Sequence, residues 1–291
     1  MATLNLIGAG RVGQTLARRW QQHGYFTVQD VLTRSADSAA AACTFIGAGR
    51  PVSDLGSMRN ADVWMLAVPD AAIAENAALL AASEAPASSI FHCSGALDSS
   101  ALAALQACGW RCASAHCLLS FTSAHSASQQ FPGTPCALEG EASTRAVLHA
   151  AFSAIGARCF DIAAQNKLLY HAGAVFATNF LPVLQATAEA AWSASGVPAE
   201  LLPDLRQALL HNAVANITRL GPAAALTGPA ARGDLAAVTR QASAVSHWDP
   251  AAGAAYRALS DLALRLANSS KASEASAAST SCAGAFSSKS I

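Results

Sequence analysis

Short apolar runs alternate with helix-like stretches along the first part of the chain, up to about residue 163. The apolar runs predict strands, which we place at Leu4–Gly8, Phe26–Leu32, Ala61–Val68, Ser89–Cys93, Cys112–His116, Thr134–Glu139 and Ala157–Asp161. The stretches between them predict helices over Val12–His23, Ala36–Ala42, Ile73–Ala82 and Leu97–Ala107. Strands that alternate with helices are typical of a parallel sheet with helices on both faces.

The pattern changes after residue 163, where strand signals end and alanine- and leucine-rich stretches begin. These stretches predict helices over Asn166–Ser195, Glu200–Leu220, Asp234–Ser246 and Pro250–Leu266. From Asn268 the chain is rich in serine and alanine and has few large apolar residues, which predicts disorder. We therefore expect an α/β fold: a doubly wound parallel sheet over residues 1–163, an all-helical domain over 164–267 and a disordered tail over 268–291.

Composition narrows the possible partners. Lys+Arg and Asp+Glu are balanced at 18 each, and no basic block is present, so the sequence favours neither nucleic acid nor an anionic membrane as a partner. Leu168–Ala188 is uncharged and long enough to span a bilayer, but it contains His171, Asn179, Pro182 and Gln185, which favours a buried helix.

The cysteines and the first residues bear on the compartment. The eight cysteines form no CxxC pair, and the start, MATLNLIGAG, has no basic region before its apolar run, so we expect a cytoplasmic protein with reduced thiols. Cys108, Cys112, His116 and Cys117 lie close together in the sequence, but their spacing is irregular and no second pair follows, so we expect no metal site.

A glycine motif opens the chain. Gly8-Ala9-Gly10-Arg11-Val12-Gly13 has the spacing GxGxxG, follows the first predicted strand and begins the first predicted helix. In that context the motif is the fingerprint of a dinucleotide-binding Rossmann domain, with the pyrophosphate at the helix N-terminus. The alternative is a glycine-rich turn in another kind of α/β protein.

The end of the second strand distinguishes NADP from NAD. Thr33, Arg34 and Ser35 stand about twenty residues after the motif, where an arginine between hydroxyls suits a ribose 2′-phosphate, with Arg11 as a second cation. Asp30 would favour NAD but falls inside the predicted strand. We expect NADP; the alternative for Arg34 is a solvated loop charge.

Two further strand ends are expected to border the nicotinamide and its ribose. These are Val68-Pro69-Asp70 and Cys93-Ser94-Gly95, and we assign cofactor contacts to Val68, Pro69, Ser94 and Gly95. Each segment has an alternative interpretation as an ordinary strand-to-helix turn, above all at Asp70.

The candidates for catalysis follow. His116, at a strand end, has a side chain suited to proton transfer, and Lys167 at the start of the long uncharged helix is positioned to protonate a carbonyl oxygen. His171 lies one turn later on the same face, and Asn179 is a candidate to orient a substrate carboxyl or amide. The alternatives are a packed histidine at position 116, a solvated lysine, and satisfied core polar groups at 171 and 179.

A polar loop, Leu226–Asp234, separates two predicted helices and supplies the substrate candidates. Arg232 is expected to bind a substrate carboxylate, with Thr227 beside it. The alternative is that Thr227 and Asp234 cap helix ends.

These segments together resemble a family that joins a Rossmann-like NADP-binding domain to a C-terminal helical domain of unknown function (DUF2520 type). The resemblance covers residues 1 to about 266 and rests on GAGRVG, VLTRS, AVPD, HCSGAL, AHCLLSF, NKLLYHAGAVFATNF and LTGPAARGD. The wider superfamily includes ketopantoate reductase, pyrroline-5-carboxylate reductase and the 6-phosphogluconate and β-hydroxyacid dehydrogenases.

The resemblance implies that NADPH reduces a C=O or C=N bond of a small carboxylate-bearing substrate, such as a ketopantoate-like 2-oxo acid, and that the helical domain forms a homodimer. Lys167 and Asn179 match the place of a lysine and an asparagine in β-hydroxyacid dehydrogenases. The chain departs from that family's GxxGxG run before the lysine, where Ala163–Asn166 stands, and has Cys117 where a proline is expected after His116.

Two other hypotheses remain open. A non-catalytic NADP-binding sensor or partner protein would keep the glycine motif without needing Lys167 or His116. A different hydride carrier, such as a deazaflavin, would occupy the same cleft.

Overall fold

The structure is a computed structural model that describes the backbone of residues 1–284 and the side chains of residues 1–269. The chain divides into two compact units, Met1–Thr178 and Asn179–Ile291. We expected the first domain to end at residue 163, but residues 164–178 group with the sheet.

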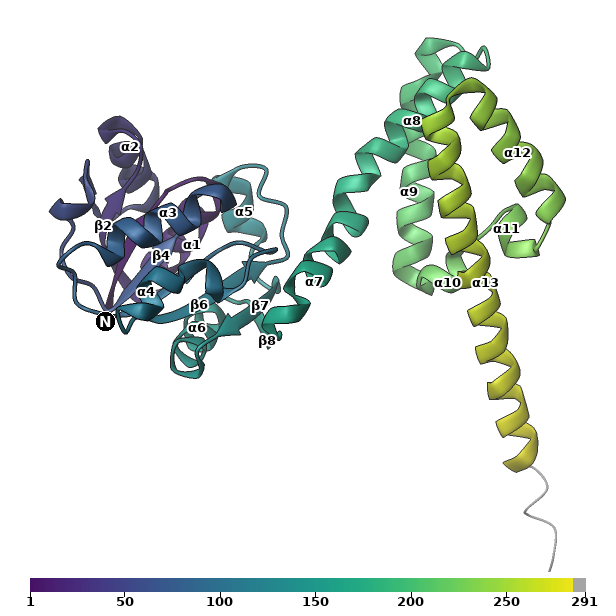
Figure 1. The fold of residues 1–291 in the computed structure, drawn as a ribbon. Coiled ribbons are helices and arrows are strands. Elements are labelled where there is room, and N and C mark those ends of the chain that lie inside the picture. The colour runs from purple at the N-terminus through teal and green to yellow at the C-terminus, as the bar shows by residue number, and fades with distance from the viewer. Residues whose placement is uncertain (285–291) are drawn as a thin grey trace, which may run out of the picture. The chain divides into compact units, whose positions relative to one another are not determined.

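An eight-stranded sheet forms the centre of the first unit (Figure 1). Its strands are β1 (Ala2–Ile7), β2 (Phe26–Leu32), β3 (Arg50–Val52), β4 (Val63–Leu66), β5 (Ser89–His92), β6 (Arg111–Cys117), β7 (Pro135–Gly140) and β8 (Arg158–Asp161). They lie in the order β3-β2-β1-β4-β5-β6-β7-β8. All neighbours are parallel except β6 and β7. The order reverses at β1, which places a ligand crevice at the carboxyl ends of β1 and β4.

Helices cover both faces of this sheet. They are α1 (Arg11–Gln22), α2 (Ala36–Ile46), α3 (Asp70–Ala81), α4 (Ala103–Ala107), α5 (Ala124–Gln130), α6 (Ala142–Ala154) and α7 (Lys167–Ala174). One buried cluster joins the sheet to α1, α2, α5 and α6 around Trp20, Phe131 and Phe152. A second joins the opposite face to α3 and α4 around Trp64. The predicted doubly wound α/β architecture is confirmed.

Three elements of this unit were not predicted. Strand β3 has only three residues, including a proline, so it carries almost no periodic signal. Helices α5 and α6 are amphipathic segments that we left between strands, and β7 runs antiparallel to β6, so the sheet is mostly rather than wholly parallel. The other predicted strands and helices of this unit are present, with shifted ends.

The second unit is helical. Its elements are α8 (Phe180–Ala194), α9 (Leu202–Leu220), α10 (Pro222–Ala225), α11 (Pro229–Arg232), α12 (Leu235–Trp248) and α13 (Pro250–Gly284). The single helix expected over Asn166–Ser195 is divided, because a π-helical turn at Val175–Asn179 follows α7. None of the helices in the described part of the chain combines the length and apolar character needed to cross a membrane.

The tail predicted to be disordered from Asn268 is helical as far as Gly284, and residues 285–291 lie outside the described residues. Alanine has the highest helix propensity, and this segment contains no proline or glycine before Gly284, which favours continuation of the helix.

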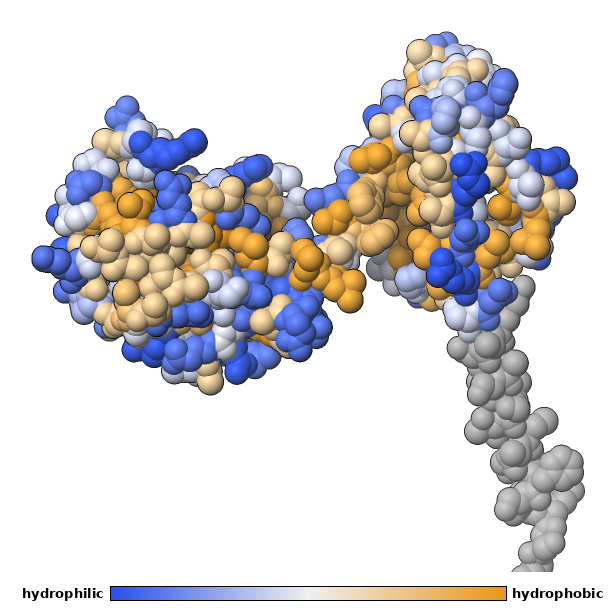
Figure 2. All heavy atoms as spheres, in the orientation of Figure 1, coloured by the Kyte–Doolittle hydropathy of each residue, from blue (hydrophilic) through white to orange (hydrophobic). Residues whose placement is uncertain are grey.

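Large apolar side chains of the second unit are exposed. Among its described side chains only Ala242 and Ala267 are buried hydrophobics, and Figure 2 shows hydrophobic residues on its surface. The exposed ones on α8 and α9 are Phe180, Val183, Leu184, Leu209, Val214, Ile217 and Leu220.

Candidate cofactor and active site

The glycine loop between β1 and α1 is shaped by close packing at two positions and open space at the third. Gly8 has φ +83°, and a Cβ there would lie 2.6 Å from the carbonyl oxygen of Ala67. A Cβ on Gly13 would lie 2.9 Å from the Ala67 Cβ. At Gly10 a Cβ would meet nothing within 4 Å, which leaves room for a ligand to approach the backbone.

The start of α1 fits a pyrophosphate. Gly10 precedes the helix, and neither a side-chain cap nor an acidic residue in the first turn occupies its N-terminal N–H groups. Uncapped N–H groups and the positive end of the helix dipole favour a phosphate. Residues 8–13 would hold this part of a dinucleotide, as predicted from the motif.

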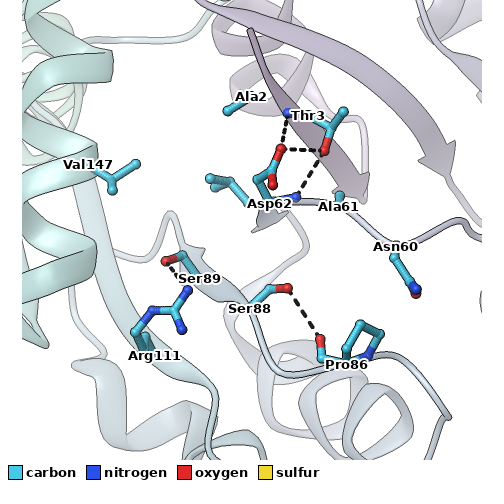
Figure 3. A pocket seen from close by; sticks show the side chains of 11 residues that line it. Ala2, Thr3, Asn60, Ala61, Asp62, Pro86, Ser88, Ser89, Arg111 and Val147 are labelled. Carbon is cyan, nitrogen blue, oxygen red and sulfur yellow. Dashed lines mark hydrogen bonds between the residues drawn. The ribbon is translucent and has the colours of Figure 1, made fainter.

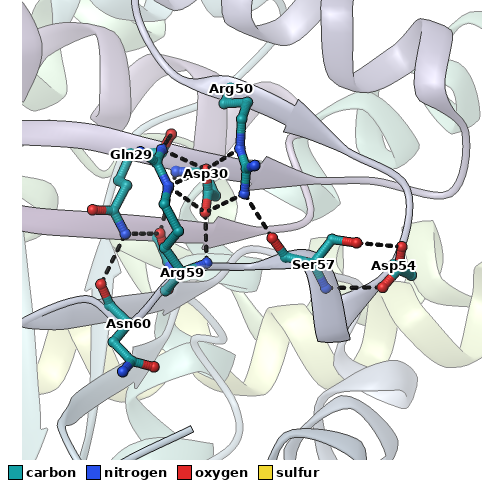
Figure 4. Close-up of polar contacts among 8 residues, drawn as sticks. Gln29, Asp30, Arg50, Asp54, Ser57, Arg59 and Asn60 are labelled. Atoms are coloured by element: carbon teal, nitrogen blue, oxygen red, sulfur yellow. Dashed lines mark hydrogen bonds and ion pairs between the residues drawn. The ribbon is translucent and has the colours of Figure 1, made fainter.

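Asp30 is committed to the protein itself (Figure 4). Its carboxylate is fully buried and pairs with Arg50 Nε at 2.9 Å and Arg59 Nη2 at 2.7 Å, and it also accepts the backbone N–H of Arg59. Burial alone would raise the pKa of Asp30, but the hydrogen bonds from Arg59 and Arg50 lower it to about 2. The carboxylate is thus unavailable to a ribose hydroxyl, which removes the sequence argument for NAD.

Replacing Asp30 by asparagine is expected to lower the free energy of unfolding at pH 7 by about 1–2 kcal/mol, since one of the two carboxylate oxygens that accept from Arg50 and Arg59 becomes an amide NH2 group, while both arginines keep contact with water. The folded-state pKa is depressed, so the wild-type advantage is present above the ordinary pKa of an aspartate and disappears as the pH falls toward 2. Urea unfolding of both proteins at pH 7 and pH 3 measures this; an equal difference at the two pH values would contradict it.

The proposed 2′-phosphate residues follow β2. Arg34 is exposed, and no hydrogen bond or ion pair of its side chain occurs within the described part of the structure. Ser35 caps α2 by accepting the N–H of Ser38 at 3.2 Å, and Thr33 donates to the Ser35 carbonyl at 2.8 Å. Arg11 is also exposed and makes one long hydrogen bond, 3.4 Å, to the Thr122 carbonyl. Arg34 is therefore free to bind an anion.

The loops after β4 and β5 are tied together. The Ser94 hydroxyl donates to Asp70 Oδ2 at 2.7 Å and accepts the N–H groups of Ala96 and Leu97. Pro69 precedes α3 and is exposed, and Val68 is half-buried. These residues lie at the same end of the strands as the glycine loop, where we expected them, although the Ser94 hydroxyl has a structural role of its own.

Three side chains meet around Gly95. His116 Nδ1, at the end of β6, lies 3.0 Å from the hydroxyl of Tyr170, and the rings of His116 and His171 are 5.5 Å apart. A Cβ added to Gly95 would lie 2.7 Å from His116 Nε2 and 2.5 Å from His171 Nδ1. That nitrogen of His171 is buried, and no hydrogen-bond partner for it occurs within the described part of the chain. We call His116, Tyr170, His171 and Gly95 the His116 cluster.

Burial favours the neutral forms of His116 and Tyr170. Burial, followed by the nearby His171 and Lys167, lowers the pKa of His116 to about 4. Burial also raises the pKa of the Tyr170 phenol. A neutral imidazole that accepts a hydrogen bond from the Tyr170 hydroxyl at Nδ1 carries its own proton on Nε2. Nε2 can then donate a hydrogen bond to a substrate atom.

Gly95→Ala tests this packing. The added methyl group would push against both imidazole nitrogens, so we expect kcat to fall roughly ten-fold through misplacement of His116. Gly173→Ala is the matched control, because a Cβ there meets nothing within 4 Å. Steady-state kinetics of both variants measures the effect; equal kcat in the two would show that the space at Gly95 is not needed.

Lys167 is placed differently from our expectation. Its side chain is 1% exposed, and Nζ donates to the Ser94 carbonyl at 2.9 Å and to the Ser114 hydroxyl at 2.6 Å. We expected an ammonium facing the cleft; in this geometry Nζ is enclosed between α7, β5 and β6. Burial lowers the pKa of Lys167, against the attraction of Glu139.

The remaining candidates lie in the second unit. Asn179 ends the π-helical turn, Thr227 precedes α11 and Arg232 ends it, and all three are exposed. Asp234 accepts the N–H of Ala237 at 3.0 Å, so the capping interpretation is confirmed for that residue.

Sequence reasoning missed three residues of the site. Tyr170, three residues after Lys167, shares its helix face, and that spacing was a usable signal. Ser114 and Glu139 alternate with buried apolar residues in their strands and gave no signal of a charged contact.

An open cavity lies at the other end of the strands. A cavity of about 450 Å³ is lined by residues that begin the strands, among them Thr3, Asp62, Ser89 and Arg111 (Figure 3). It is at the amino ends of the strands, opposite the glycine loop, and its polar side chains are bonded to one another. Among the described residues no group of histidine, cysteine, aspartate and glutamate side chains is arranged to hold a metal.

Two family models match in succession. NADP oxidoreductase coenzyme F420-dependent matches residues 3–91, and the domain of unknown function DUF2520 matches residues 134–263. The chain joins these two domain families. The comparison with curated proteins gave no match.

Solved structures share this two-domain fold. Protein TM1727 of Thermotoga maritima is 24% identical, with a TM-score of 0.75 over 92% of this chain and 99% of that one. The "putative NADP oxidoreductase" BF3122 of Bacteroides fragilis is 21% identical, with a TM-score of 0.69 over 91% and 98%. Pyrroline-5-carboxylate reductase of Coxiella burnetii is 15% identical, with a TM-score of 0.54 over 91% and 98%.

Proposed function

We propose that this protein is an NADP-dependent oxidoreductase that reduces the C=O or C=N bond of a small carboxylate-bearing substrate. The observation that carries the proposal is the His116 cluster, which stands at the same end of the sheet as the uncapped glycine loop. A neutral hydrogen-bond donor beside a nicotinamide site is the arrangement that carbonyl or imine reduction needs.

Each residue of the site has its own role in the proposed reaction. NADPH supplies the hydride when bound. Residues 8–13 and Arg34 bind the phosphates, while the Tyr170 hydroxyl fixes the imidazole of His116 so that Nε2 points toward Gly95. Nε2 donates a hydrogen bond to the substrate oxygen or nitrogen and stabilises the negative charge that develops there as the hydride is added, and a proton from water then completes the reduction. His171 Nδ1, which is buried and unpartnered, is available for a second polar group of the substrate.

The proposed substrate class rests on the chemistry of an exposed side chain and on similarity to solved structures. The exposed side chain of Arg232 suits a carboxylate, and two similar structures are a pyrroline-5-carboxylate reductase and an imine reductase. A ketopantoate-like 2-oxo acid or a cyclic imine is the substrate we would test first.

The test is a panel of 2-oxo acids and cyclic imines with purified protein, NADPH and NADH, followed at 340 nm. Tight NADPH binding with turnover of at least one substrate supports the proposal. Binding without turnover across the panel would favour the non-catalytic sensor. Because the first domain matches a family described as coenzyme F420-dependent, a reduced deazaflavin forms a second arm of the panel.

We also propose a homodimer through the helical unit. The exposed apolar side chains of α8 and α9 are the observation that supports it, since contiguous apolar surfaces of this kind are covered in stable proteins. Sedimentation equilibrium of the full chain measures the mass; a monomer at micromolar concentration would contradict this.

A further inference from the structure

A buried polar chain connects α7 to the sheet. Lys167 Nζ donates to the Ser114 hydroxyl at 2.6 Å, and that hydroxyl donates to Glu139 Oε2 at 2.9 Å. The same carboxylate accepts the N–H and the hydroxyl of Ser99, each at 2.8 Å. Lys167, Ser114 and Glu139 are 1%, 0% and 5% exposed.

Attaching a helix to the sheet through these buried charged and polar groups is energetically costly. Removing a lysine and a glutamate from water costs several kcal/mol per ion before their attraction compensates, and apolar residues of similar size commonly attach a helix at least as stably. The charged groups also fix the rotation of α7 about its axis, because Nζ reaches its two acceptors when the helix has this rotation. A shift of α7 by one residue turns the helix by about 100° and withdraws Nζ from Ser114.

The rotation fixed in this way determines the His116 cluster. Residues three and four positions after Lys167 lie on the same helix face, and these are Tyr170 and His171. In this rotation the Tyr170 hydroxyl lies 3.0 Å from His116 Nδ1, and His171 Nδ1 faces Gly95. Ser94, which accepts from Nζ through its carbonyl, directly precedes Gly95, so the same lysine holds the other wall of the cluster.

We propose that Lys167, Ser114 and Glu139 form a positioning device that sets the rotation of α7 and the placement of Gly95, and so aligns Tyr170 and His171 with His116. Lys167 is then a positioning residue rather than the proton donor. Glu139 and Ser114, on β7 and β6, are part of the machinery although neither lies at a strand end. The inference rests on the proposed function only for its kinetic consequence.

Glu139→Gln and Ser114→Ala test the device, with Glu141→Gln as the matched control. Glu141 is exposed, two residues away, and bonds only to Ser143 among the described side chains. We expect kcat to fall roughly ten- to a hundred-fold in both test variants, while the Kd for NADPH stays within about two-fold. Ser114→Ala keeps both charges and is the milder variant should Glu139→Gln fail to fold.

A structural readout separates alignment from simple loss of stability. The imidazole ¹⁵N shifts of His116 and the ring-to-ring cross-peaks between His116 and Tyr170 are recorded by NMR, below the melting temperature of each variant. We expect both to change in the test variants and to stay unchanged in Glu141→Gln.

Folded Ser114→Ala with unchanged His116 signals and unchanged kcat would overturn the proposal. If the wild type reduces no substrate of the panel, the proposed function fails while the NMR comparison still decides the positioning role.

Discussion

His116→Ala is expected to lower kcat/KM by roughly 10²–10⁴-fold while the Kd for NADPH changes little. The variant loses the Nε2–H donor that His116 directs toward Gly95, and general acid–base or hydrogen-bonding groups of this kind contribute about that factor. Stopped-flow reduction at 340 nm and quenching of intrinsic tryptophan fluorescence by NADPH measure the two quantities separately.

Two further variants decide what His116 does. His116→Gln carries an amide N–H near the position of Nε2 and should recover part of the lost rate, whereas His23→Gln, an exposed histidine at the end of α1, should behave as wild type. Because the pKa of His116 is lowered to about 4, its imidazole stays neutral from pH 8 to about 5, and its contribution to wild-type kcat/KM should be constant over that range. Full activity in His116→Ala would exclude the proposed role.

The proposed cofactor residues could be placed close together from the sequence because their signals are local. GxGxxG directly follows a strand of six residues, and Arg34 follows the next strand. The order along the chain alone therefore places both at the carboxyl ends of neighbouring strands. The choice of Arg34 over Asp30 rested on strand position. The structure supplies a stronger reason, since Arg50 and Arg59, 20 and 29 residues away, hold the carboxylate.

The catalytic half was only partly predictable. His116 was identified from its strand end, but its partner Tyr170 comes from a helix 54 residues later, and no local pattern links them. Lys167 was identified from its isolation before an uncharged helix, and its burial depends on Ser94 and Ser114, 73 and 53 residues away. Non-local contacts of this kind decide whether a lone lysine faces solvent or the core, and only the fold reveals them.

Arg34→Ala is expected to weaken NADPH binding roughly 10- to 100-fold and to leave NADH binding within about two-fold of wild type. A charge-assisted, bidentate contact to a phosphate contributes about 1.5–3 kcal/mol, and NADH lacks the 2′-phosphate that would receive it. Arg34 is exposed and has no partner in the described structure, so its removal should leave the free energy of unfolding unchanged.

The matched control is Arg158→Ala, an exposed arginine at the start of β8, on the opposite edge of the sheet from β2 and β3. Fluorescence titration of both variants with both nucleotides gives four dissociation constants. The contact is specific to the 2′-phosphate only if the dissociation constant of Arg34→Ala for NADPH changes while the other three constants stay at their wild-type values. A parallel loss for NADPH and NADH would instead place Arg34 near a part that both cofactors share, and equal constants in all four titrations would return it to a solvated loop charge.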